Sequence, residues 1–235
     1  MEKKKLLIKI RKELRNKADK IYKQGAENFF KESIKIYGVR APELRCIARK
    51  FFPKSIEKEE LFNLCEELLK SGYGEEAHIA FGWAYHLKKD YKVSDFLVFE
   101  KWLKRYVSDW GMCDDFCGHN LGYLIFSFPQ LLPRVKRWTK SKNRWLRRAS
   151  AVSLIYSVRK RRYLKEIFKT AKILLEDTDD LVQKGYGWML KEASNVYQRE
   201  IFDFVMAHKR KMPRTALRYA IEKMPLNLKK KAMSK

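Results

Sequence analysis

Apolar residues recur at helical spacing from one end of this 235-residue chain to the other, and this feature limits the possible folds most. Near the start, Leu7, Ile10 and Leu14 follow the spacing, and Asn16 offers an end to that helix. The sequence has no sustained alternation of apolar and polar residues between turn signals, which is the pattern of a half-buried strand. The sequence therefore predicts an all-α protein.

Turn-forming residues divide this helical pattern into segments. A second helix is predicted around residues 22–36, and Gly38 can adopt the left-handed conformation that ends many helices. Pro53 interrupts the pattern, and a further helix is predicted to begin near Glu57 and to close at Gly72.

Two blocks in the later half are similar at an offset of 36 residues. Residues 143–149 (NRWLRRA) align with residues 179–185 (DDLVQKG), and both begin with a residue suited to capping a helix. Residues 214–220 (RTALRYA) fall in phase about one period later. Helix pairs at this period predict a HEAT-like helical-repeat solenoid with a concave basic face, as a single domain over residues 1–235. An irregular helical bundle stays open as the alternative.

Positive charge is in large excess and unevenly placed. The chain has 53 basic and 28 acidic residues, a formal net charge of +25. From Phe116 to Lys165 there is no Asp or Glu, while Arg and Lys recur around Trp138 and Trp145. Because guanidinium groups suit bidentate contacts with phosphate oxygens, this stretch predicts binding of a polyanion. The net charge alone fits equally well a protein that binds a ribosome, an anionic membrane surface or a highly charged small ligand.

Several function classes lack their sequence signals. The sequence has no apolar run as long as a membrane span, and its Lys-rich start resembles an amphipathic helix, so we expect a cytoplasmic protein without a membrane partner. It also has no Gly-rich phosphate loop and no zinc-protease motif. Cys113, Cys117 and His119 are of metal-ligand types, but cysteines four apart on an apolar helix are typical of small buried residues. We expect no metal and no cofactor.

The stretch over residues 108–119 (SDWGMCDDFCGH) leads into the acid-free region. If it is helical, Trp110 and Asp114 lie one turn apart on one face. Such a pair is most often a core contact and a solvated charge. Its position next to the basic region indicates instead a polyanion that approaches a single acidic group. Asp115 points about 100° away from Asp114 on the same helix, so it is not expected to share that role.

Five spaced blocks resemble the AlkD-like DNA alkylation repair proteins, which are DNA glycosylases built from HEAT-like repeats. The blocks occur in the family's order over nearly the whole chain: residues 37–45 (YGVRAPELR), Trp110 with Asp114, residues 145–149 (WLRRA), residues 183–192 (QKGYGWMLKE) and residues 214–220 (RTALRYA). The resemblance implies a monofunctional enzyme that excises positively charged N7-alkylguanine and N3-alkyladenine from duplex DNA without flipping the base. We expect it to act as a monomer.

The resemblance also implies roles for individual residues. It places the catalytic aspartate on Asp114, the two cleft tryptophans on Trp110 and Trp188, and the phosphate-contacting arginine on Arg148. Phe29 stands where an aromatic hydroxyl is expected, so the family's polar contact is not implied there. Further contacts to DNA are expected from basic residues of the same blocks and their surroundings: Arg144, Lys142, Lys184 and Lys191.

Two alternatives of other classes stay open. One is a non-catalytic, structure-specific DNA-binding protein that retains the cleft, and the other is an RNA- or ribosome-associated helical-repeat protein. The presence of Trp110, Asp114, Arg148 and Trp188 together favours the enzyme over the first alternative. A carboxylate among cations has no evident purpose in the second. The expected partner is therefore double-stranded DNA that contains alkylated bases.

Overall fold

The computed structural model describes residues 2–234, and these residues form helices and no strand, which confirms the all-α prediction. The chain divides into two compact units. Unit 1 comprises the described residues up to Tyr91 together with Arg105–Asp115, and unit 2 comprises Lys92–Lys104 and the described residues from Phe116 onward. The single domain over residues 1–235 and its concave basic face stay predictions. Within residues 2–234, no helix is both long and apolar enough to cross a membrane.

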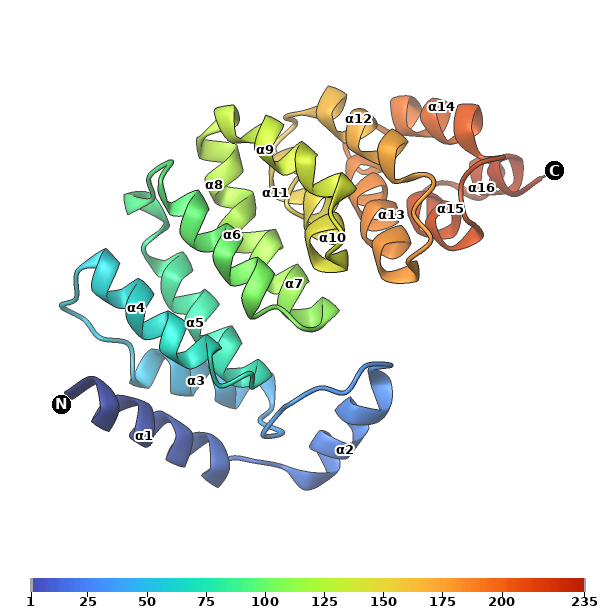
Figure 1. Cartoon of the computed structure of the whole chain (residues 1–235). Helices are drawn as coiled ribbons and strands as arrows, with labels where there is room; N and C mark the ends of the chain where they lie inside the picture. The colour runs from blue at the N-terminus through green and yellow to red at the C-terminus, as the bar shows by residue number, and fades with distance from the viewer. Residues whose placement is uncertain (1, 235) are drawn as a thin grey trace. The chain divides into compact units, whose positions relative to one another are not determined.

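Unit 1 contains the N-terminal helices and most of α7 (Figure 1). These helices are α1 (Glu2–Asn16), α2 (Lys20–Phe29), α3 (Ala41–Lys50), α4 (Lys58–Leu69), α5 (Gly74–His86) and α7 (Trp110–Phe116). α4 packs on α5, and α3 packs on both α1 and α5. The apolar stripe of α4 is fully buried: Leu61, Leu64, Cys65 and Leu68. Arg11 of α1 donates to the buried carboxylate of Glu76 in α5 at 3.0 Å, which adds a charged bond to this apolar packing.

The second helix is shorter than predicted. It ends at Phe29, and Phe30 is extended (φ −85°, ψ 139°), so the end predicted near residue 36 is wrong. None of the residues of α2, all of which the structure describes, is buried. Because most helical stability in proteins comes from packing an apolar face, this segment lacks the contact that would carry the helix further.

Gly38 has a positive φ of +95°, but it does not end a helix. The buried carboxylate of Glu75 in α5 accepts the main-chain N–H groups of Tyr37, Gly38 and Val39 at 3.0, 2.8 and 3.1 Å. A Cβ at Gly38 would lie 2.7 Å from the main-chain oxygen of Asp19. The turn therefore needs glycine, and α5 holds it in place.

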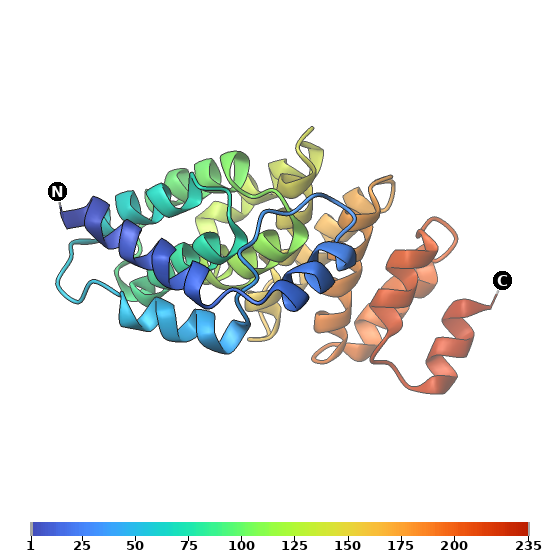
Figure 2. The same ribbon diagram turned by 90° about the horizontal axis from the view of Figure 1, so that it is seen from below.

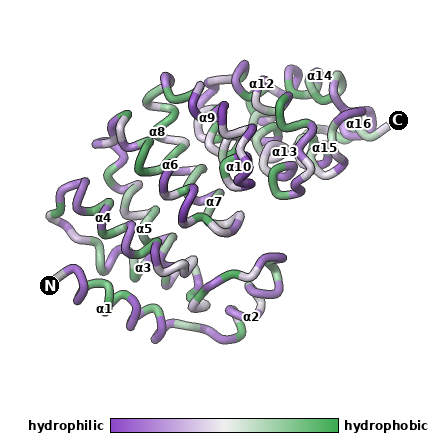
Figure 3. Tube along the Cα trace, viewed as in Figure 1, coloured by the Kyte–Doolittle hydropathy of each residue, from purple (hydrophilic) through white to green (hydrophobic). Residues whose placement is uncertain are grey.

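Unit 2 is a series of helices with short connections, of which the later ones, orange to red, follow one another in Figure 2. Its elements are α6 (Asp95–Arg105), whose last residue belongs to unit 1, the π-helical turn η2 (Cys117–Leu121), α8 (Gly122–Ser127), α9 (Leu132–Arg137), α10 (Arg144–Val152), α11 (Ile155–Val158), α12 (Leu164–Leu174), α13 (Asp180–Ser194), α14 (Gln198–His208), α15 (Arg214–Ile221) and α16 (Leu226–Met233). α13 packs against α10, α12, α14 and α15. Hydrophobic and hydrophilic residues alternate along the helices, as expected where each buries one face (Figure 3).

The predicted repeat has matching helix starts. Asn143 caps α10 by accepting from the N–H of Trp145 at 2.8 Å, and Asp179 caps α13 by accepting from that of Leu181 at 3.0 Å. This confirms that both blocks begin with a capping residue. The third block begins at Arg214, the first residue of α15.

Two glycines let α13 approach its neighbours closely. A Cβ at Gly185 would lie 3.0 Å from Cγ of Arg148 in α10. On the α15 side, a Cβ at Gly187 would lie 2.7 Å from Cβ of Tyr219 and 2.9 Å from the main-chain oxygen of Ala216. α13 is thus fixed between α10 and α15 by contacts that leave no room for a side chain.

Candidate functional site

The α7 helix holds the first part of the predicted site, in unit 1. Trp110 is its first residue and Asp114 lies four residues later, so the two are one turn apart, as the helical expectation requires. Asp109 starts the helix by accepting from the N–H of Met112 at 2.9 Å.

Trp110 is packed against two phenylalanines at the end of α2. The Phe30 ring stacks on the indole with centroids 4.8 Å apart and planes 13° apart, and Phe29 meets it edge-on at 5.9 Å. Phe29 is 71% exposed, so it covers the indole while remaining open to solvent. The sequence singled out Phe29, but it gave no signal for Phe30, whose position depends on the early end of α2.

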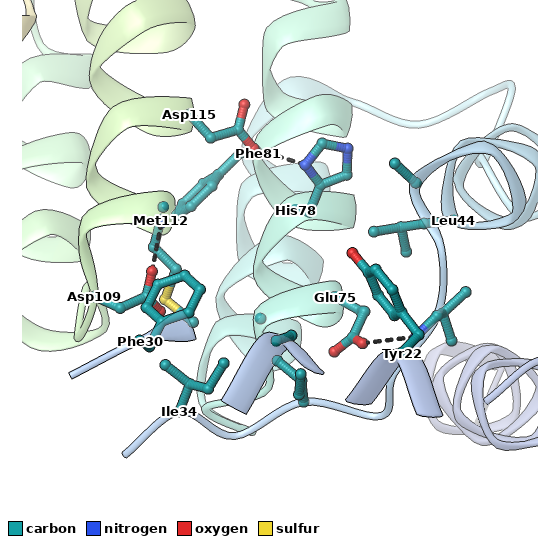
Figure 4. A pocket seen from close by; sticks show the side chains of 16 residues that line it. Tyr22, Phe30, Ile34, Leu44, Glu75, His78, Phe81, Asp109, Met112 and Asp115 are labelled. Atoms are coloured by element: carbon teal, nitrogen blue, oxygen red, sulfur yellow. Dashed lines mark hydrogen bonds and ion pairs between the residues drawn. The ribbon is translucent and has the colours of Figure 1, made fainter. Parts of the chain in front are cut away.

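Three carboxylates lie on or beside α7 and differ in their surroundings. Burial raises the pKa of Asp109, the N–H groups of Met112 and Gly111 oppose that rise, and the charges of Glu32 and Asp114 add to it. Asp115 points toward α5, where its Oδ2 lies 2.8 Å from Nδ1 of His78 (Figure 4). The His78 contact was not predicted, because its partners are 37 residues apart in the chain.

A cavity of about 250 Å³ lies in unit 1 and is lined by Phe30 of this aromatic group (Figure 4). Apolar side chains such as Phe30, Phe81 and Met112 form much of its wall, and His78 and Asp115 also line it. The Phe30 ring therefore contacts both the cavity and the indole of Trp110.

Unit 2 holds the other predicted site residues. Arg148 in α10 is only 5% exposed, and its Nη1 donates to the main-chain oxygen of Leu181 in α13. Its aliphatic stem lies over Gly185. Arg148 thus contributes to the α10–α13 contact, a structural part that the sequence did not indicate.

Trp188 in α13 belongs to a chain of polar contacts. Its Nε1 donates to Glu192 at 3.0 Å, and Arg159 donates to the same carboxylate at 2.9 Å. Burial alone would raise the pKa of Glu192, but the hydrogen bonds from Arg159 and Trp188 and the nearby cations hold it below its ordinary value.

The remaining predicted DNA contacts differ in their partners. Arg144 pairs with Asp179 at 2.6 Å, Lys184 with Asp180 at 3.1 Å, and Lys191 with Glu222 at 3.3 Å. Lys142 is exposed in the loop before α10.

The acid-free stretch receives carboxylates from later in the chain. Besides Arg144, Arg147 pairs with Asp177 at 2.6 Å and Arg159 with Glu192. Carboxylates from later in the chain therefore neutralise part of this basic stretch. Eight exposed cations of the stretch form no ion pair with a residue that the structure describes: Lys136, Arg137, Lys140, Lys142, Lys160, Arg161, Arg162 and Lys165.

Cys113 and Cys117 are both fully buried. In the part of the chain that the structure describes, no three His, Cys, Asp or Glu side chains are grouped to hold a metal ion. The absence of a metal and of a cofactor stays a prediction.

Comparison with known proteins bears on the family and the fold. The profile of the DNA alkylation repair enzyme family matches residues 10–224. The chain belongs to this family. A solved structure titled as a predicted DNA alkylation repair enzyme from Enterococcus faecalis has the same fold, with a TM-score of 0.79 over 89% of this chain and 98% of that one, at 15% sequence identity. No curated protein matches the sequence significantly.

Proposed function

We propose that this protein is a DNA glycosylase that excises cationic alkylpurines from duplex DNA. The observation that carries the proposal is the placement of Trp110 and Asp114 one turn apart on α7 in a chain of the DNA alkylation repair enzyme family. The N7-alkylguanine and N3-alkyladenine lesions and the action without base flipping come from the resemblance to AlkD-like proteins. The monomeric state and cytoplasmic location expected from the sequence stay predictions.

The proposed chemistry asks little of an acid catalyst. An N-alkylated purine already carries a positive charge, so it leaves with the electron pair of the C1′–N bond and becomes neutral. The positive charge passes to the deoxyribose, which gains oxocarbenium character. In this proposal the Asp114 carboxylate stabilises that charge and orients the attacking water, which forms the new C1′–O bond and loses a proton to solvent.

The aromatic and basic residues have supporting roles in the proposal. The resemblance to AlkD-like proteins assigns to the indole faces of Trp110 and Trp188 the contact with the cationic sugar and lesion. Since Phe30 covers one face of Trp110, that face is closed to the sugar and the lesion. Arg148 contacts a phosphate through donors other than the Nη1 group that binds Leu181.

A non-catalytic DNA-binding protein is the second candidate. The burial of Arg148 and its bond to Leu181 favour this alternative, because they give the arginine a purpose within the fold. A helical-repeat protein with the same exposed cations would then bind DNA without acting on it.

Release of methylated bases from an alkylated duplex, measured by mass spectrometry under single-turnover conditions, tests the proposal. We expect release of N7-methylguanine and N3-methyladenine, and none of unmodified guanine or adenine. If the wild-type protein binds the duplex and releases no base, the glycosylase proposal is rejected in favour of the non-catalytic DNA-binding protein.

A further inference from the structure

A groove in unit 1 gathers cations that the proposed reaction does not use. It lies between α3 and α5 and encloses a cavity of about 490 Å³. Its functional lining consists of two arginines, two histidines, an aromatic ring and a glycine: Arg45, Arg49, His78, His86, Phe52 and Gly82.

Helical spacing places these residues in two facing rows. Arg45 and Arg49 are four apart on α3, so they share one face. His78, Gly82 and His86 follow one another at intervals of four on α5. Because α3 and α5 pack together, the two rows border a single groove.

The two arginines differ from several cations of the same unit. Elsewhere in unit 1, basic side chains pair with carboxylates at 2.7–3.2 Å: Lys3 with Glu60, Arg11 with Glu76, Lys17 with Glu43, Arg40 with Asp19 and Lys50 with Glu13. Arg45 and Arg49 are exposed, and neither pairs with a carboxylate that the structure describes. Arg49 donates a hydrogen bond to the sulfur of Cys46 at 3.5 Å. Like charges four apart on a helix repel, so an anion in the groove would relieve a repulsion that the fold leaves in place.

Gly82 opens the middle of the groove. It is exposed within α5, and a Cβ built there would meet no described atom within 4 Å. Since glycine disfavours the interior of a helix, the missing side chain points to close approach of a ligand to the main chain of α5. The Phe52 and His86 rings, 4.6 Å apart, border the same space with flat surfaces.

The groove leads to the α7 helix. His78 lines it and also lines the smaller cavity shown in Figure 4. Its Nδ1 lies 2.8 Å from Oδ2 of Asp115, the residue after Asp114. A ligand that occupies the groove therefore ends beside the segment that carries the proposed catalytic carboxylate.

We propose that this groove binds consecutive phosphodiesters of one DNA strand and directs that strand toward α7. The choice of DNA as the polyanion rests on the proposed function. Arg45 and Arg49 supply two phosphate contacts, and the absence of a side chain at Gly82 admits the sugar–phosphate backbone. The sequence pointed to the acid-free stretch from Phe116 to Lys165 for the basic surface, and this groove adds a separate anchoring site in unit 1.

The charge test compares two double variants by fluorescence anisotropy with an undamaged duplex over a series of salt concentrations. For Arg45→Gln with Arg49→Gln, we expect affinity to fall at least roughly tenfold. The slope of log K against log salt should become shallower by about two, because each phosphate that the protein neutralises contributes about 0.9 to it. The matched control, Lys4→Gln with Lys5→Gln, removes the same charge from exposed positions of α1 and should change affinity less than about twofold. Equal reductions in DNA affinity for the two double variants would overturn the groove proposal.

A neutral variant separates shape from charge. Gly82→Gln fills the groove without altering the net charge, and the open space at this position makes it compatible with the fold. We expect unchanged or raised thermal stability and affinity lowered at least about fivefold. Unchanged affinity in this variant would also overturn the proposal.

These outcomes are separable from those of the proposed reaction. If binding depends on Arg45 and Arg49 but no base is released, the groove proposal is kept and the glycosylase proposal is rejected. If the wild type releases bases and the Arg45→Gln, Arg49→Gln variant binds normally, the glycosylase proposal is kept and the groove proposal is rejected. Tighter, Arg45- and Arg49-dependent binding of an RNA duplex of the same sequence would assign the groove to RNA and overturn the DNA proposal.

Discussion

The helices α7 and α13 each present a tryptophan and a carboxylate four residues apart. In α13, Trp188 donates its indole N–H to Glu192, and Arg159 neutralises that carboxylate. In α7, Trp110 stacks on Phe30, and the charge of Asp114 adds slightly to the burial that raises the pKa of Asp109. With the same spacing, the tryptophan and the carboxylate are hydrogen-bonded to each other in unit 2, whereas in unit 1 the carboxylate lies on an acidic turn and the tryptophan in an aromatic stack.

The difference shows that the spacing by itself does not distinguish Asp114, the proposed catalytic carboxylate, from Glu192. Glu192 is held by a cation and an N–H donor, so its charge already has a structural use. Asp114 belongs to a segment with three carboxylates, Asp109, Asp114 and Asp115, in a chain whose net charge is +25. Local negative charge is what a developing sugar cation requires, and this supports the assignment of Asp114.

The largest expected difference between α7 and α13 is in the stability lost when the glycine next to each tryptophan is replaced. Gly187→Ala should lower the free energy of unfolding by about 2 kcal/mol, because its Cβ would overlap Tyr219 and the main chain of Ala216. Gly111→Ala should cost much less, since its Cβ would meet the Asp109 carboxylate at 3.1 Å and the Phe30 ring at 3.6 Å. Chemical denaturation measures both, and equal decreases would contradict the view that α13 is the more tightly fixed helix.

The two carboxylates should differ in catalysis. Asp114→Asn should slow single-turnover excision of N7-methylguanine at least about tenfold, equivalent to roughly 1.4 kcal/mol of barrier, while much of the DNA affinity remains. Glu192→Gln should change the rate less than about twofold.

Asp115→Asn is a second comparison for that experiment. Its amide oxygen can still accept from His78, so the contact between α5 and α7 is kept. We expect little change in rate. An Asp114→Asn protein as active as wild type would reject the catalytic assignment.

The tryptophans should have smaller effects on the same step. Trp110→Ala and Trp188→Ala should each slow excision by roughly twofold to fivefold, the range expected for cation–π contacts of about 0.5–1 kcal/mol. Rates measured with saturating enzyme isolate this step from binding. A decrease for either variant larger than that of Asp114→Asn would move the main catalytic contribution from the carboxylate to the indoles.

The smallest expected effect is on the pH dependence of stability. The folded-state pKa of Asp109 is raised, mainly by burial, so its contribution to stability falls as pH rises through the ordinary aspartate pKa toward the folded-state value. Asp109→Asn keeps an acceptor for the N–H of Met112 and should stabilise the protein at neutral pH by less than about 1 kcal/mol. Thermal unfolding should show this gain disappear at a pH below about 3.9, where the aspartate is also uncharged.

The sequence by itself determined the features that depend on neighbouring residues. The helical class, the caps Asn143 and Asp179, and the placement of Trp110 and Asp114 on one turn all follow from interactions within about four residues. The five spaced blocks also identified the family. Such local interactions are encoded directly in residue order, and this is why they could be predicted.

Tertiary structure decided the partners of those residues. The end of α2 at Phe29, the capture of the turn at Gly38 by Glu75, and the contact between Asp115 and His78 each depend on packing between distant segments. Arg144, Arg147 and Arg159 likewise find carboxylates 30–35 residues further along the chain. Helical periodicity states which face a residue occupies but not which helix meets that face, so these contacts appear only once the helices are packed.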